Sequence, residues 1–88
     1  VCHGMKGLLE EGIEAIEEDG HPAVVDAGIV AAAQRVEHYE ISGYGTAARI
    51  AKLIGDEESA KLLVETLEEE KSTDEKLTEV ADNMLYPE

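Results

Sequence analysis

The chain has 88 residues, of which 21 are acidic and 7 basic, so its formal net charge is −14 at pH 7. This length allows one domain at most, and with three Tyr as the only aromatic residues any core must consist of Ala, Val, Leu and Ile. The charge argues against binding to nucleic acid or to an anionic membrane surface, because both require a basic protein face. Divalent cations or basic partners are compatible with it, although most of the acids are expected simply to keep the protein soluble.

Cys2 is the only cysteine, so no disulfide can form within the chain, which favours a reducing, cytoplasmic compartment. We expect its thiol to act as a small buried apolar group. The sequence shows no signal peptide and no apolar run long enough to span a bilayer. It begins at Val1, which we interpret as the start of a fragment or of a processed product.

A short amphipathic helix is expected over residues 4–18. Its apolar side chains recur at spacings of three and four residues, which marks one face of a helix. They are Met5, Leu8, Leu9, Ile13 and Ile16. Residues 19–22 end this helix, because their glycine and proline break helical structure.

A long helix is expected over residues 23–54, with Gly55 in the position that follows a helix C-terminus. One stripe along it has spacings that alternate between four and three residues, the pattern of closely packed helices. Its members are Ile29, Ala33, Val36, Glu40, Gly43, Ala47, Ile50 and Ile54. This stripe is predicted to be the core seam of the helix, and Glu40 places a carboxylate at its centre.

A second long helix is expected over residues 57–84, capped at its N-terminus by Asp56. Its seam shows the same unbroken alternation. The members are Ala60, Leu63, Leu67, Glu70, Asp74, Leu77, Ala81 and Met84. Two consecutive positions of this seam are therefore acidic.

The two long helices are joined by little more than residues 55–56, so they are expected to be antiparallel neighbours. Glu40 and Glu70 lie at matching distances on either side of this turn, and so do Glu37 and Asp74. At a rise of about 1.5 Å per residue, each pair sits at nearly the same height. We therefore predict that these four carboxylates converge in the middle of the hairpin.

Crowded carboxylates in a poorly hydrated site repel one another, and a divalent cation relieves that conflict. Oxygen ligands suit iron, manganese, magnesium or calcium, and di-metal carboxylate proteins build such sites inside four-helix bundles. The competing interpretation is that the acids form a solvated helix surface. His38 is turned roughly 200° from the seam and is expected to orient or pack rather than ligate, whereas Glu69 and Tyr44 are auxiliary candidates.

Several segments of the chain form a recognisable pattern. They are Cys2-His3-Gly4-Met5 through Gly12, Ala32 to Ile41 with the block Glu37-His38-Tyr39-Glu40, Tyr44-Gly45-Thr46, and Thr66 to Lys71 followed by Asp74 and Leu77. These segments resemble the YciE/YciF family of ferritin-like stress proteins. The resemblance covers nearly the whole chain, to about Ala81.

In that family a complete domain is a four-helix bundle with a short extra helix, so the resemblance implies an all-α, ferritin-like fold and a di-iron or related carboxylate site. The chain matches only the C-terminal half of the family domain, so residues 1–88 are interpreted as one helical domain that is half of a complete ferritin-like one. Neither long helix contains a Glu-x-x-His motif. The metal ligands that the resemblance implies are Glu37, Glu40, Glu70 and Asp74 or Glu69.

Two functions are compatible with these observations. The first is a ferritin-like, stress-associated protein that binds a di-metal centre of iron or manganese, with ferrous iron oxidation as an open further activity. The alternative is a non-catalytic helical oligomerisation module without bound metal. In both cases we expect a homo-oligomer or a complex with a separate N-terminal hairpin, because one hairpin and a short helix leave a side uncovered.

Overall fold

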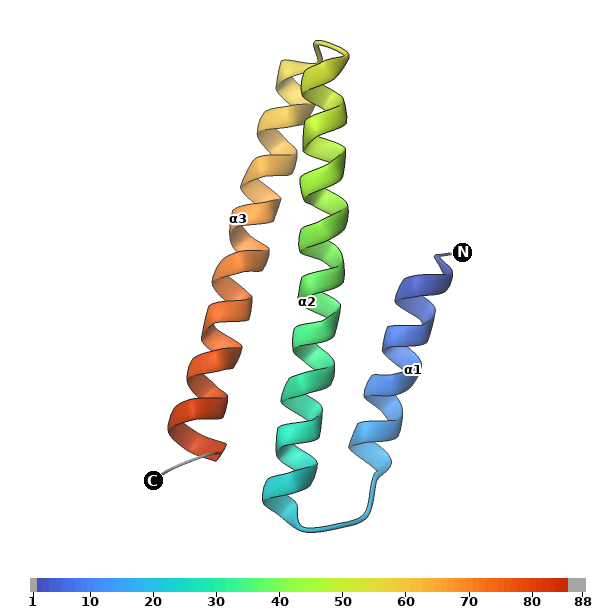
Figure 1. Cartoon of the computed structure of the whole chain (residues 1–88), viewed down its shortest axis with the longest axis vertical. Helices are drawn as coiled ribbons and strands as arrows, with labels where there is room; N and C mark the ends of the chain where they lie inside the picture. The colour runs from blue at the N-terminus through green and yellow to red at the C-terminus, as the bar shows by residue number, and fades with distance from the viewer. Residues whose placement is uncertain (1, 86–88) are drawn as a thin grey trace.

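The computed structural model describes residues 2–85, and the side chains of residues 2–83, as three helices followed by a short π-helical segment. The elements are α1 (His3–Glu17), α2 (Pro22–Leu53), α3 (Glu57–Val80) and the π-helix η1 (Ala81–Leu85) (Figure 1). The expected all-helical class, a short helix and a long antiparallel hairpin, is confirmed. The third helix differs from its expected range, because the α-helical pattern ends at Val80. The side chain of Met84, predicted as a seam member, lies outside the described side chains.

The ends of the helices are set by local chemistry at the two connections. The His21 ring nitrogen Nδ1 accepts a hydrogen bond from the Ala23 backbone N–H at 3.2 Å, at the start of α2. Asp56 caps α3, since its Oδ1 accepts from the Ser59 backbone N–H at 3.0 Å. Between α2 and α3, Gly55 adopts a positive φ of 79°, which glycine does at little cost. The hairpin turn covers residues 54–56, one residue more than the connection that the sequence indicated.

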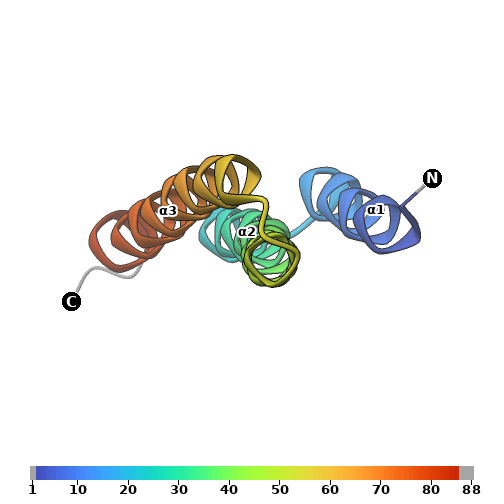
Figure 2. The same cartoon turned by 90° about the horizontal axis from the view of Figure 1, so that it is seen from above.

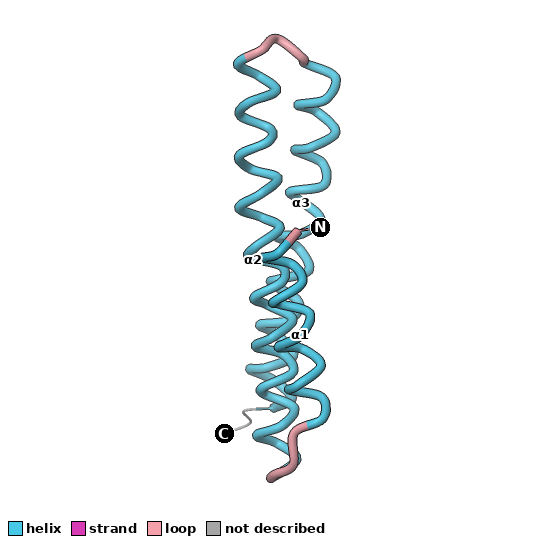
Figure 3. Tube along the Cα trace, turned by 90° about the vertical axis from the view of Figure 1, so that its right-hand side faces the viewer, coloured by secondary structure: helices cyan, strands magenta, loops and turns pink. Residues whose placement is uncertain are grey.

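The three helices lie in a single layer with α2 in the middle (Figure 2). Both α1 and α3 pack against α2, and the edge-on view shows the two connections at opposite ends of the layer (Figure 3). The molecule measures 51 × 32 × 12 Å, and its thickness is about the diameter of one helix. The buried apolar residues in the described part are all alanines: Ala32, Ala48, Ala51, Ala60 and Ala81.

The stripe that was predicted to be the core seam of α2 is only partly covered, and the prediction is wrong at the C-terminal end of the stripe. Ile50 and Ile54 are 53% and 74% exposed. The physical reason is that α2 has a neighbour on each side, so the stripe lies between α1 and α3 on the open face of the layer. Only Glu40, at its centre, reaches a charged group of α3.

The side of α2 that reaches α3 is an adjacent stripe. Gln34 donates a hydrogen bond to Thr78 Oγ1 at 2.8 Å, and Glu37 contacts Glu70. Ala48 and Ala51 lie two heptads further along the same side of α2 and are buried. The contact between the long helices therefore includes small and polar side chains.

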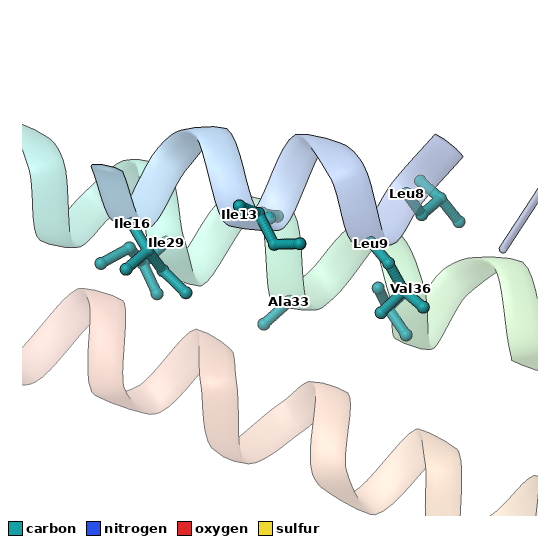
Figure 4. Close-up of a pocket in the computed structure, with 9 residues that line it drawn as sticks. Leu8, Leu9, Ile13, Ile16, Ile29, Ala33 and Val36 are labelled. Atoms are coloured by element: carbon teal, nitrogen blue, oxygen red, sulfur yellow. The ribbon is translucent and has the colours of Figure 1, made fainter. Parts of the chain in front are cut away.

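Open grooves follow the predicted stripe along α2. One lies between α1 and α2, and Figure 4 shows the side chains that line it, among them Leu9, Ile13, Ile29 and Val36. The next along α2 includes Glu40, and a third reaches Ile50. Within residues 2–85, no helix is both long enough and apolar enough to cross a membrane.

Candidate metal centre

Three of the four predicted carboxylates meet where α2 contacts α3. Glu37 and Glu40 are three residues apart on α2 and so share a face of the helix. Glu70, on α3, lies within hydrogen-bonding reach of both. All three side chains are half-buried. The structure therefore brings these acids together at the height that counting from the turn indicated, while their role as metal ligands stays a prediction.

Crowding and burial shift the titration of this cluster. Burial raises the pKa of Glu40, and the negative charge of Glu70 raises it further. The contact with Glu37 is the largest cause that raises the pKa of Glu70, followed by burial and by the charge of Glu37, whereas the contact with Glu40 acts in the opposite direction. Both shifts favour the protonated, uncharged form of these two carboxyl groups.

One oxygen of this cluster has no partner. Glu37 Oε2 is buried and makes no hydrogen bond, although Glu70 lies beside its carboxyl group. Ionised carboxylates accept hydrogen bonds but donate none, so two charged groups cannot satisfy each other. A buried acceptor without a donor is costly. Protonation of Glu70 removes this cost, and so does a cation bound between the two groups.

The glutamates do not form a complete ligand set by themselves. In the part of the chain that the structure describes, no group of three or more His, Cys, Asp or Glu side chains is placed to hold a metal ion. The contacts instead form two pairs, Glu37 with Glu70 and Glu40 with Glu70. All of these groups come from one layer of helices, which supplies ligands from one side only.

Asp74, the fourth predicted ligand, is engaged by two side chains of α2. Its Oδ1 lies 2.9 Å from His38 Nε2 and accepts a hydrogen bond from Gln34 Nε2 at 3.4 Å. The contact with His38 fits the orienting role that was expected for this histidine. Gln34 was missed as a site residue, although its position one turn before Glu37 was a usable signal. The same amide donates to Thr78, one turn after Asp74.

The two auxiliary candidates lie at the edge of the cluster. Glu69 is exposed, and its negative charge contributes to the raised pKa of Glu70. Tyr44 lines the same groove as Glu40. In the described part of the chain, neither Glu69 nor Tyr44 forms a hydrogen bond with the carboxyl groups of Glu37, Glu40 and Glu70.

Cys2 is exposed, so the prediction of a buried apolar thiol is wrong. Its Sγ lies 2.9 Å from Tyr39 Oη, and this hydrogen bond lowers the pKa of Cys2 and raises that of Tyr39. A Cβ on Gly4 would lie 2.7 Å from Tyr39 Oη, so this position requires a glycine for the observed contact. The thiol therefore helps to hold the start of α1 against the middle of α2.

Comparison with known proteins places the chain in a family. The model of DUF892, described as a domain of unknown function, matches residues 1–86. The chain belongs to the DUF892 family. Protein YciF of Escherichia coli (strain K12) is 56% identical to this chain over 82 residues, which cover 93% of this chain and 49% of YciF. A structure described as the crystal structure of the E. coli stress protein YciF matches with a TM-score of 0.90 and 56% identity, over 93% of this chain and 52% of that one.

These matches confirm the resemblance that the sequence motifs indicated, together with the ferritin-like helical class. The chain spans about half the length of the relatives it matches. This DUF892 chain is therefore a homologue of a protein described as a stress protein.

Proposed function

We propose that this DUF892 chain supplies one half of a ferritin-like di-metal centre in a stress-associated protein. Glu37, Glu40 and Glu70 are the ligands of this half-site, and Asp74 is the fourth candidate. The observation that carries the proposal is the buried Glu37 Oε2 without a hydrogen-bond partner, beside a glutamate whose pKa is raised by it. Oxygen donors of this kind suit iron or manganese.

The surrounding contacts support this assignment. Ligands of metal sites are commonly oriented by further hydrogen bonds, and His38 and Gln34 hold Asp74 in this way. The remaining ligands would come from a second helical hairpin that covers the open face. Bound iron would supply redox chemistry between its ferrous and ferric states. The cytoplasmic location inferred from a single cysteine remains part of this proposal.

The alternative function is a structural module in which no metal binds. The contact between Glu37 and Glu70 supports it, because one shared proton would also satisfy the buried oxygen. The absence of a closed ligand set among the described residues is compatible with it as well. Elemental analysis separates the two functions: the proposed centre predicts near-stoichiometric iron or manganese in protein purified without added metal, and the module predicts traces.

A titration of the chain with manganous ion tests the assignment of ligands. Glu70→Gln is expected to weaken binding by about tenfold or more, because it removes the carboxylate that contacts both glutamates of α2. Glu69→Gln is the matched control, since it makes the same change at the exposed neighbouring residue and is expected to alter affinity less than about twofold. Equal effects of the two variants, measured by calorimetry, would contradict the proposed site.

A further inference from the structure

Four side chains link α2 to α3 about one turn away from the paired carboxylates, and we call them the clasp. Gln34 Nε2 donates to Asp74 Oδ1 at 3.4 Å and to Thr78 Oγ1 at 2.8 Å. The Thr78 hydroxyl in turn donates to the backbone carbonyl of Asp74 at 3.3 Å, and His38 Nε2 lies 2.9 Å from Asp74 Oδ1. Besides the glutamate pairs, these are the only side-chain hydrogen bonds and ion pairs between α2 and α3 within residues 2–83.

The clasp uses the hydrogen-bonding capacity of Asp74 Oδ1 completely. An amide nitrogen carries two hydrogens, and Gln34 directs one to Asp74 and the other to Thr78. A carboxylate oxygen has two lone pairs, and Asp74 Oδ1 is contacted by both His38 and Gln34. This oxygen is therefore not free to bind a cation.

Asp74 is also directed away from the glutamates. Its partner His38 lies roughly 200° around α2 from Glu40, and Glu40 lines a groove on the open face of the layer. Asp74 follows Glu70 by one turn of α3, yet its charge is not among the causes that raise the pKa of Glu70. The contacts of Asp74 thus lie on the far side of the hairpin from the groove.

The clasp lies where the two long helices need a directional contact. Ionised Glu37 and Glu70 repel each other and push the helices apart at their level. Nearer the turn the buried contacts are made by alanines such as Ala48 and Ala60, and apolar contacts are non-directional. A hydrogen bond weakens steeply outside a range of about 2.7–3.2 Å, and a slide by one residue is about 1.5 Å. The clasp therefore fixes the register of the helices.

We infer that Asp74 is a positioning residue rather than a metal ligand, and that the clasp holds Glu37 and Glu70 level with each other. Gln34 stands one turn before Glu37, and Asp74 stands one turn after Glu70, so the clasp holds both helices beside their carboxylates. The inference rests on the proposed function, and it reduces the ligands of this half-site to Glu37, Glu40 and Glu70.

Calorimetric titration with manganous ion separates the two roles of Asp74. Asp74→Asn keeps Oδ1 as an acceptor for His38 and Gln34 but removes the carboxylate. The matched control is Glu75→Gln, which removes the same charge at the exposed next residue, and the two affinities should agree within about threefold. Asp74→Ala removes the acceptor and should weaken binding by about tenfold, as loss of an orienting group does.

Two results of this titration would overturn the inference. A loss of about tenfold or more in Asp74→Asn relative to Glu75→Gln is the result expected of a ligand. An Asp74→Ala chain that binds manganous ion as tightly as the parent would show that the clasp positions nothing.

A double-mutant cycle in chelator tests the clasp without metal. The effects of His38→Ala and Asp74→Ala on the equilibrium constant of unfolding should be coupled by at least about threefold, because the two side chains contact each other. The control cycle pairs His38→Ala with Glu69→Ala, which removes an exposed acid of α3, and there the effects should be additive within about twofold. Additive effects in both cycles would overturn the clasp.

The two experiments separate the clasp from the metal centre. Binding that is kept in Asp74→Asn and lost in Glu70→Gln supports both the proposed function and the inference. Binding that is lost equally in the two variants supports the metal centre and overturns the positioning role. Coupling between His38 and Asp74 in a parent chain that takes up no metal contradicts the proposed function and supports the clasp as the contact that sets the register.

Discussion

At Glu70, the contact with Glu37 makes the stability of the protein sensitive to pH. The pKa of Glu70 is raised, first by its contact with Glu37, and burial raises that of Glu40. The folded state therefore binds more protons than the unfolded state between the ordinary glutamate pKa, about 4.3, and the raised values. The stabilisation that the folded state gains from these bound protons is fully present below the ordinary glutamate pKa. It is lost as the pH rises through the raised pKa values of Glu70 and Glu40.

We predict that Glu70→Gln reduces this loss of stability. The new amide donates a hydrogen bond to Glu37 at every pH, so the buried oxygen no longer depends on a proton, and the free energy of unfolding at pH 7 should rise by about 1 kcal/mol. Urea unfolding in chelator, from pH 4 to about 8, measures this. Glu69→Gln is the control, and an equally steep decline for the Glu70 variant and the parent would contradict the prediction.

Of the described elements, α1 packs against α2 alone. Its ion pair, Arg35 Nε to Glu11 Oε2 at 3.1 Å, joins two side chains that are each about half exposed, and such pairs contribute little. Three of its large apolar side chains are exposed, namely Leu9, Ile13 and Ile16, the last at 66%. The thiol–hydroxyl contact between Cys2 and Tyr39 adds a further link between the start of α1 and α2.

We predict that Gly7→Ala stabilises α1, because a Cβ there meets open space and alanine is favoured over glycine inside a helix by about 1 kcal/mol. The corresponding rise in Tm is about 4 °C. Gly4→Ala should give no net gain, because its Cβ displaces the Tyr39 ring and breaks the contact with Cys2. Thermal melts followed by circular dichroism compare the two, and equal stabilisation would contradict the close packing at Gly4.

The whole molecule combines a net charge of −14 with a layer only 12 Å thick. A thin layer brings few apolar groups out of water, so the stabilisation it gains from burial is small. Repulsion between like charges lowers the stability of the folded state further. Both properties make the stability of this chain depend strongly on its ionic surroundings.

We predict that sodium chloride stabilises the folded chain. An increase from about 0.01 M to about 1 M shortens the Debye length from about 30 Å to about 3 Å, which screens the repulsion between acids more than it weakens the few exposed ion pairs. Tm in chelator should rise over this range at constant protein concentration. A neutral osmolyte at matched osmolality is the control, and a Tm that stays constant or falls with salt would contradict the prediction.

The sequence by itself determined the helices, the antiparallel hairpin and the meeting of Glu37, Glu40 and Glu70. These features depend on local chemistry and on counting: caps such as Asp56, a short turn, and a fixed rise per residue place side chains along a helix axis. The family resemblance pointed to the same acids. The sequence alone therefore predicts which side chains of two antiparallel helices lie at the same level along the helix axes.

Only the tertiary structure decided which side of α2 faces which neighbour. Two adjacent stripes of this helix are both compatible with packing, and the choice between them depends on the competing contacts of α1 and α3. Gln34 reaches Thr78 and Cys2 reaches Tyr39, although these pairs are far apart in the sequence. Once both neighbours are in place, the more regular apolar stripe, with Ile50 and Ile54, is left on the open face.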